Sequence, residues 1–436
     1  MMMSKQSGIP APVTLRVGVF FDGTGNNQGN AAPMSSTGHG CAVGSYANAR
    51  SNIALLHALY PLGPVQGQVH FSVYVEGIGT THGAPDSSFA QATGRGSAGV
   101  AARVEQALAE VGRQLRDYRA EHPQVVPECI EFDLFGFSRG AAAARHLANR
   151  LGKDEVGLPA ELHGPRAINF IGLFDTVAAI VAPLQGSFDP ASDHYGGLRL
   201  GLDTLVARQV VQLVAGDEQR HNFPLVRSDN DIVVPGVHSN IGGGYREHMR
   251  EQVLLCKPQS SRVARTTPAE CTSAHAAVNG LLTSTFAGLV DPRPRLLSWE
   301  VPIQGSRARR DDPEKQVYAA VYREREVSGH LSRVYLSIMR ELAVRGGVPL
   351  APLGCDDAHH LPAELLPVSR KLHEFALGHC AQLRLTTQER ALLQAKYVHT
   401  SAHWNAVKGL DNSALDAFYI DRPGKVGRVL HKNPVK

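Results

Sequence analysis

A serine flanked by glycines lies where a strand-like stretch passes into a helix-like one. Residues 130–135 alternate apolar and polar side chains, which is typical of a half-buried strand. The next five residues read Gly-Phe-Ser-Arg-Gly, and residues 141–147 are almost all strong helix formers. Glycines two positions before and after a serine let the chain turn sharply and leave the serine Oγ accessible. This arrangement predicts that Ser138 is an activated nucleophile.

Strand-like and helix-like segments alternate along much of the chain. We expect further strands at 15–21, 69–75, 167–174 and 232–237, and helices at 51–60, 99–119 and 318–344. Such alternation is typical of a parallel, doubly wound α/β sheet. We therefore expect a catalytic core at 13–250, an insertion or lid-like region at 251–317, and a helical and loop C-terminal region at 318–436 that packs on the core.

Chemically reactive side chains follow four of the predicted strands. They are the turn Asp22–Gly23, then Ser138, Asp175 and His238. Ligands of open parallel sheets bind at the carboxyl ends of the strands, so these residues should meet. The order serine, aspartate, histidine is that of α/β-hydrolase triads, in which histidine accepts the serine proton and aspartate orients the histidine. The amide of Arg139 and the Asp22–Gly23 turn are the predicted oxyanion donors. The expected fold is α/β-hydrolase-like: a doubly wound, mostly parallel sheet with a lid-like insertion and a C-terminal extension.

Other residues compete for the acid and base roles. His399 and His403 lie where a late strand would deliver a base, as the final strand does in many α/β hydrolases. Asp217 and Asp231 are lesser candidates for the acid. Asp175 would alternatively cap the helix that follows it, and His238 would pack against the glycines at 242–244.

Composition and spacing argue against several other functions. The chain has 44 basic and 40 acidic side chains and a formal net charge of +4, which is too balanced to favour nucleic acid. The six cysteines form no C-x-x-C pair, so we expect free thiols and no metal. The pattern G-x-G-x-x-G at 94–99 has no strand directly before it, the turn after Phe21 lacks the lysine of a P-loop, and His373-Glu374 with His379 has the wrong spacing for zinc. We expect no cofactor.

Two apolar segments bear on membranes and on export. The run at 168–184 is interrupted by polar residues and is short for a membrane span, while residues 276–290 would form either core or a lid that touches lipid. Residues 1–12 lack the apolar core of a signal peptide, so we expect synthesis in the cytoplasm without one.

Several motifs together resemble a known family. Residues 19–26, 136–141, 174–177 and 235–245 are similar to type VI secretion phospholipase effectors and to the wider, uncharacterised α/β-hydrolase family that they share. The resemblance implies a metal-free lipase that cleaves acyl esters of membrane phospholipids (A1 or A2 type), with Ser138, Asp175 and His238 as the triad. It also implies delivery into the periplasm of rival cells, a secretion spike protein as carrier and a cognate immunity protein. The family usually has aspartate where this chain has Asn240.

Two further hypotheses remain open at the level of sequence. One is a cytoplasmic esterase or thioesterase that acts on small esters with the same serine. The other is a non-catalytic, secretion-associated protein that binds a spike or a target through its C-terminal region.

Overall fold

The structure is a computed structural model. It describes residues 13–31, 44–46, 48–65, 67–81, 83, 86–87, 94, 96–152, 157–180, 189–289, 292–303, 313–354, 359–406, 416 and 419–434.

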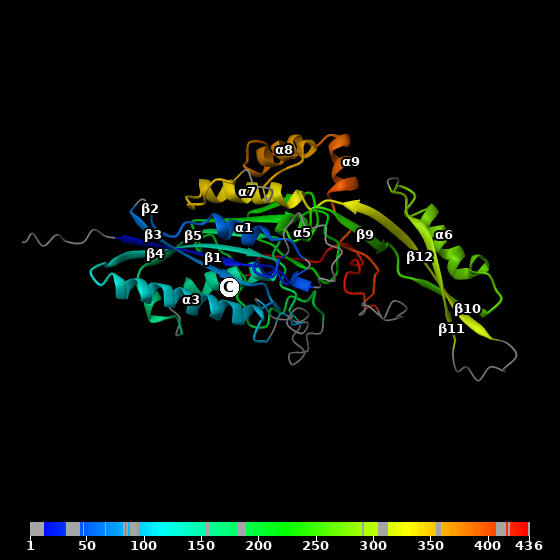
Figure 1. The fold of residues 1–436 in the computed structure, drawn as a ribbon, viewed down its shortest axis with the longest axis horizontal. Coiled ribbons are helices and arrows are strands. Elements are labelled where there is room, and N and C mark those ends of the chain that lie inside the picture. The colour runs from blue at the N-terminus through cyan, green and yellow to red at the C-terminus, as the bar shows by residue number, and fades with distance from the viewer. Residues whose placement is uncertain are drawn as a thin grey trace, which may run out of the picture.

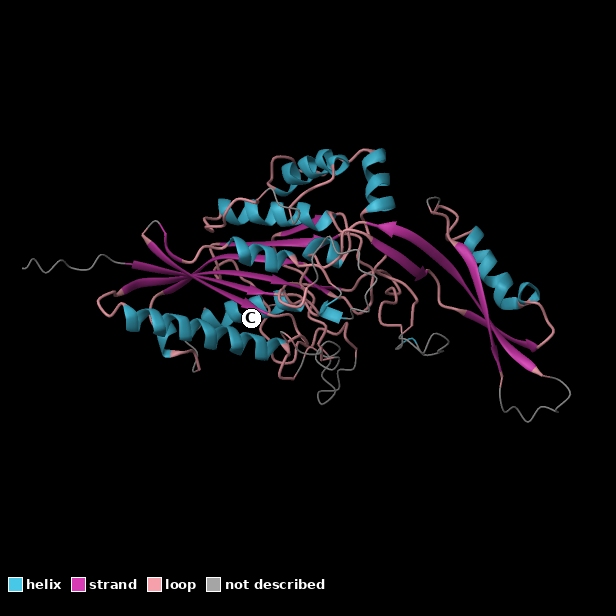
Figure 2. Cartoon of the chain, in the orientation of Figure 1, coloured by secondary structure: helices cyan, strands magenta, loops and turns pink. Residues whose placement is uncertain are grey.

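A seven-stranded sheet forms the centre of the molecule (Figure 1 and Figure 2). Every neighbouring pair in it is parallel except β2 with β3. In spatial order the strands are β2 (Gly63–Val65), β3 (Gln68–Val75), β1 (Val13–Phe21), β4 (Pro127–Phe137), β5 (Arg166–Phe174), β6 (Gln209–Ala215) and β8 (Asp231–Val234). The predicted α/β class with a mostly parallel sheet is confirmed, although β6 was not predicted.

Helices cover both faces of this sheet. Side chains alternate along a strand, so in β1 Val17 and Val19 pack toward one helical layer while Phe20 packs toward the other. The buried stripe of the longest helix, α3, includes Val104, Leu108 and Val111 at helical spacing. One layer consists of α3 (Val100–Glu121) and α4 (Arg139–Leu151), and the other of α1 (Asn52–Leu59) and α7 (Leu331–Arg345) (Figure 1).

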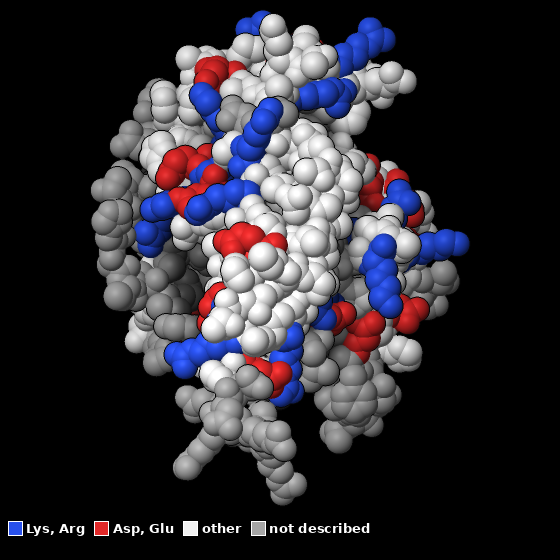
Figure 3. All heavy atoms as spheres, turned by 90° about the vertical axis from the view of Figure 1, so that its right-hand side faces the viewer, with Lys and Arg blue, Asp and Glu red and all other residues white. Residues whose placement is uncertain are grey.

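A separate antiparallel sheet projects from one end of the molecule (Figure 1). Its long strand β12 (Glu314–Val327) pairs with β11 (Arg295–Pro302) on one side and with β10 (Gln259–Ala264) and β9 (Met249–Leu254) on the other. Helix α6 (Ser273–Thr283) packs on this sheet through a small core of its own. Figure 3 views this end of the molecule and shows a band of uncharged side chains bordered by charges of both signs.

The helix predicted at 318–344 is wrong in its first part. Residues 318–327 belong to β12, and only α7, from Leu331, is helical. Buried side chains alternate at Val317, Ala319 and Val321, and Trp299 on β11 stacks on Tyr318 at 5.6 Å between ring centroids. These cross-strand contacts outweigh the helix propensity of the alanine, glutamate and arginine residues in this segment. The predicted insertion, 251–317, lies within this unit, whose central strand continues beyond it.

The C-terminal region returns to the core. Helix α8 (Leu366–Ala376) packs beside α7, and α9 (Thr387–Lys396) lies against β12 (Figure 1). The last described segment, 419–434, then forms β13 (Leu430–His431), which pairs in parallel with β7 (Leu225–Val226). This pairing carries the tail to the carboxyl edge of the central sheet, where β1, β4 and β5 end.

Two sequence expectations concern thiols and membranes. Cys129, Cys256, Cys271 and Cys380 are free, and the other two cysteines lie outside the described residues. Within the described ranges, no helix is both long and apolar enough to cross a bilayer.

Candidate active site

Ser138 occupies a strained turn between β4, which ends at Phe137, and α4, which begins at Arg139. Its backbone has φ 59° and ψ −126°, a conformation that non-glycine residues rarely adopt. A Cβ on Gly136 would lie 2.5 Å from the Cα of Ala141, and one on Gly140 would lie 2.3 Å from the carbonyl oxygen of Asp22. Both glycines are therefore required by close backbone packing, which holds the serine at the tip of the strand.

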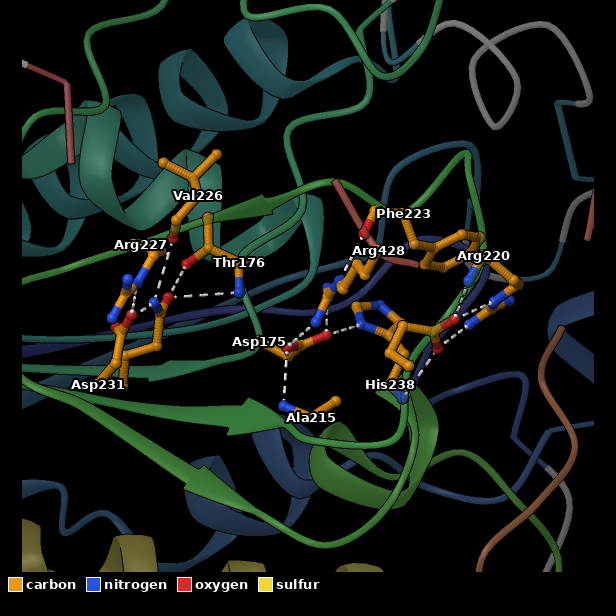
Figure 4. Close-up of polar contacts among 12 residues, drawn as sticks. Asp175, Thr176, Ala215, Arg220, Phe223, Val226, Arg227, Asp231, His238 and Arg428 are labelled. Atoms are coloured by element: carbon orange, nitrogen blue, oxygen red, sulfur yellow. Dashed lines mark hydrogen bonds and ion pairs between the residues drawn. The ribbon is translucent and has the colours of Figure 1, made fainter. Parts of the chain in front are cut away.

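Asp175 follows β5 and also has a positive φ, 46°. Its side chain is fully buried. Oδ1 accepts hydrogen bonds from the amide of Ala215 at 3.0 Å and from Arg428 Nη1 at 2.8 Å, and Oδ2 accepts one from Arg428 Nη2 at 2.8 Å (Figure 4). Burial alone would raise the pKa of Asp175, but Arg428 and then His238 hold it well below its usual range. The carboxylate is therefore ionised and fixed in orientation.

His238 opens the short helix α5 (His238–Gly242) just after β8 and turns its ring toward Asp175 (Figure 4). Its Nδ1 donates to Oδ2 of Asp175 at 2.5 Å. The ring lies between Phe137 and Phe223, whose centroids are 4.7 and 5.0 Å away. Burial lowers the pKa of His238, while Asp175 opposes this effect. A neutral ring with Nδ1 protonated has its free lone pair on Nε2, which is the state of a general base.

A second buried ion pair supports the histidine from behind. Glu218 accepts the backbone amide of His238 at 3.2 Å and pairs with Arg220 through two hydrogen bonds of 3.0 and 2.9 Å. The guanidinium of Arg220 stacks 3.3 Å above the centroid of the Phe223 ring, which itself contacts His238. Glu218 and Arg220 thus fix both the backbone of the histidine and one wall against its ring.

Ser138 and His238 line one cavity of about 620 Å³. Most of its exposed surface is apolar and includes Phe137, Val177 and Ile420. Its polar lining residues include Thr24, Arg139, Arg220 and three asparagines, Asn26, Asn48 and Asn222. A cavity of this size and largely apolar surface has room for an apolar chain beside Ser138.

The turn after β1 differs in detail from the expectation. The amide of Gly23 donates to Oδ1 of Asp22 at 2.7 Å, and Oδ2 of Asp22 accepts from the Tyr74 hydroxyl at 2.6 Å. Burial raises the pKa of Asp22 to about 6. A Cβ on Gly23 would lie 2.3 Å from the Phe137 ring. Glycine is thus required here by packing against the residue before the serine, and its amide is already used by Asp22.

The competing histidines lie elsewhere. His399 stacks on Tyr245 at 3.7 Å between centroids, and its Nδ1 contacts the Asn240 side-chain amide at 3.1 Å. Burial lowers the pKa of His399 to about 4. His403 Nδ1 accepts the amide of Asn405, and its Nε2 lies 3.7 Å from Asp421. The structure brings His238, and neither of these two, to Asp175.

The competing acids and Asn240 hold local structure. Asp217 accepts the amide of Gly236 at 2.6 Å, and Asp231 accepts the amide and hydroxyl of Ser228. Asn240 accepts the amide of Val237 and donates to the carbonyl of Tyr397 at 3.0 Å. A carboxylate at position 240 would be unable to make that donation.

No group of three or more potential metal-ligating side chains occurs in the described part of the chain. The 94–99 glycine pattern lies directly before α3, with residue 95 outside the description.

Sequence reasoning assigned no role to Arg428, Glu218 or Arg220. Arg428 lies 253 residues from Asp175 along the chain, in a segment with no strong periodicity. A buried acid that follows an apolar strand does signal that some cation must pair with it, but it does not say which one.

A solved structure of the Tle1 effector bound to the VgrG spike from the type VI secretion system is similar to this chain. It has a TM-score of 0.73 and 26% sequence identity, and the match covers 97% of this chain and 94% of that one. An uncharacterized protein from Pseudomonas aeruginosa matches with a TM-score of 0.42 and 19% identity, over 94% of this chain and 56% of that one. A scan of protein-family models and a search of curated proteins returned no match. The predicted resemblance to type VI secretion effectors is confirmed.

Proposed function

We propose that this chain is an antibacterial phospholipase A, of A1 or A2 type, delivered by a type VI secretion system. The observation that carries the proposal is the 2.5 Å contact of His238 with Asp175, on a histidine that shares its cavity with the strained Ser138. The same arrangement supports an α/β-hydrolase-like fold, because Ser138 follows β4, Asp175 follows β5 and His238 follows β8.

Acylation begins at the serine. Nε2 of His238 takes the proton of Ser138 as Oγ attacks the ester carbonyl of a phospholipid, and Asp175 stabilises the imidazolium that forms. The tetrahedral intermediate collapses as His238 returns that proton to the lysophospholipid oxygen, which leaves. The fatty acyl group remains on Oγ as an ester.

Deacylation runs the same sequence with water. His238 removes a proton from a water molecule that attacks the acyl carbonyl, and it then protonates Oγ of Ser138 as the fatty acid departs. The apolar walls at Phe137, Val177 and Ile420 suit the acyl chain during both steps.

The oxyanion needs donors beside Ser138. The amide of Arg139 opens α4, where the first backbone N–H groups of a helix have no partner within it. The amide of Gly23 is bound to Asp22, so we assign the second donor to the backbone amide of Thr24. Thr24 is the next residue of the same turn and lines the cavity. Asp22 then acts by fixing the turn.

Product analysis tests the hydrolase directly. Vesicles of phosphatidylethanolamine and phosphatidylglycerol with different acyl chains at sn-1 and sn-2 are incubated with the protein, and free fatty acid and lysophospholipid are measured by mass spectrometry. The wild type should release one fatty acid class. Ser138→Ala should release none, whereas Ser284→Ala, at the exposed end of α6, should match the wild type. Undiminished release by Ser138→Ala would overturn the proposal, and activity on short soluble esters alone would favour an esterase.

Delivery and restraint form the second part of the proposal. By similarity to the Tle1 effector, we expect the chain to bind a cognate spike protein, to act in the periplasm of rival cells and to be neutralised by an immunity protein. Periplasm-targeted expression in a test bacterium should be toxic, and Ser138→Ala should be harmless. Toxicity that survives Ser138→Ala would point to a non-catalytic toxin, and failure to co-purify with the spike encoded beside it would contradict the delivery route.

A further inference from the structure

The side chain of Arg139 is a buried cation at the wall of the reactive cavity. The residue is 8% exposed, and its Nε donates to the Thr24 hydroxyl at 2.7 Å. Among the described residues it has no hydrogen bond or ion pair to a carboxylate. Burial lowers the pKa of Arg139 to about 10, so the guanidinium is still charged at neutral pH.

Other buried arginines of the chain are compensated. Arg16 pairs with Asp133 at 2.8 Å, Arg220 with Glu218 at 2.9 Å, and Arg428 with Asp175 at 2.8 Å. Arg145 has no ion pair with any residue that the structure describes, but it donates to three backbone carbonyls and to the Gln212 side chain. A buried charge without a partner is strongly unfavourable. We therefore expect a bound ligand to supply the negative charge that compensates Arg139.

We propose that Arg139 binds the phosphate of the phospholipid substrate and thereby sets the preference for phospholipids over neutral glycerides. This inference rests on the proposed function and specifies the chemistry that the same site recognises. A guanidinium presents paired N–H donors that match two phosphate oxygens, and it does so most strongly where water is excluded.

Arg139 and Ser138 lie close enough to contact one phospholipid molecule at its phosphate and its ester. Arg139 directly follows Ser138, and both residues line the cavity. In a glycerophospholipid the phosphate is only a few bonds from the acyl esters, so an ester held at Ser138 keeps its phosphate within reach of the neighbouring side chain. The start of α4 adds a positive partial charge at the same point. Arg220 also lines the cavity, but Glu218 and Asp421 already occupy its donors.

The test compares two lipid substrates, one with a phosphoglycerol head group and one without it. Phosphatidylglycerol and diacylglycerol with the same acyl chains are presented in the same mixed micelles to the wild type, Arg139→Gln, Arg139→Lys and Arg113→Gln. Arg113 on α3 is an exposed arginine whose replacement changes net charge equally. The rate ratio of phosphatidylglycerol to diacylglycerol should fall at least tenfold in Arg139→Gln, less in Arg139→Lys, and stay at the wild-type value in Arg113→Gln.

A measurement on the wild type covers the case in which the variants fail to fold. Glycerol 3-phosphate should competitively inhibit hydrolysis of a short neutral ester, whereas glycerol at the same concentration should not. An unchanged rate ratio in Arg139→Gln, a parallel fall on both substrates, or equal effects of glycerol and glycerol 3-phosphate would overturn the inference. If the wild type cleaves neither lipid, the proposed function itself fails, which is a different result from equal cleavage of both lipids.

Discussion

Replacing Arg428 with glutamine removes the cation that the C-terminal tail brings to Asp175. The guanidinium donates to both carboxylate oxygens at 2.8 Å and, through Nε, to the carbonyl of Phe223 at 2.7 Å. Because Asp175 is fully buried, its charge would keep only His238 as an ionisable partner. Removing one partner of a buried ion pair destabilises a protein by about 3–5 kcal/mol. We expect Arg428→Gln to lose stability in that range at pH 7.

The pH dependence of that loss follows from the direction of the pKa shift. The pKa of Asp175 is lower in the folded chain than in the unfolded one, so its stabilisation is present above the unfolded value of about 3.9 and is lost as pH falls through the folded value. Without Arg428 the folded pKa rises toward the unfolded one. The stability difference between wild type and Arg428→Gln should therefore be largest near neutral pH and shrink in acid.

Urea denaturation at several pH values measures this difference. Arg422→Gln is the matched control, because Arg422 lies in the same tail and its side chain donates to the backbone carbonyl of Asp416. It should remain within about 0.5 kcal/mol of the wild type. Equal stability of Arg428→Gln and wild type at pH 7, or a difference that does not change with pH, would refute the reasoning.

The site and the elbow make three further predictions. The acid limb of the pH profile of kcat/KM should have an apparent pKa below the usual histidine value of about 6.5, because burial lowers the pKa of His238 more than Asp175 raises it. An apparent pKa above that value would contradict this prediction. His238→Gln should reduce ester hydrolysis about a thousandfold or more, while His399→Gln should retain activity, and the opposite result would make His399 the base. In thermal melts Gly140→Ala should destabilise the protein by about 1–3 kcal/mol, because the new Cβ would clash with backbone atoms. Gly280→Ala in α6, where a Cβ would have no atom within 4 Å, should stabilise it by up to about 1 kcal/mol. Similar shifts in melting temperature for both variants would argue against the packing account.

Features that depend on neighbouring residues could be predicted from the sequence. The strand, serine and helix around position 138 follow from local propensity and from two glycines, and the structure has the same elements there. The meeting of Asp175 with His238 could also be predicted, because parallel strands end at one edge of a sheet, so residues that follow different strands converge.

Features that depend on residues far apart in the chain could not be predicted from the sequence. Arg428 reaches Asp175 only because β13 pairs with β7, and a pair of two-residue strands leaves no periodicity to detect. The strand at 318–327 carries helix-forming side chains and becomes a strand through its pairing with β9, β10 and β11. The Asp22 side chain, which accepts the amide of Gly23, is itself held by the hydroxyl of Tyr74, 52 residues away along the chain.

Covalent trapping of the nucleophile tests the central claim most directly. A long-chain alkyl fluorophosphonate phosphonylates an activated serine with loss of fluoride, and peptide mapping by mass spectrometry locates the adduct. We predict a single adduct on Ser138, absent in Ser138→Ala and formed far more slowly in His238→Gln. An adduct on another residue, or equal labelling rates in wild type and His238→Gln, would contradict a nucleophile at Ser138 activated by His238.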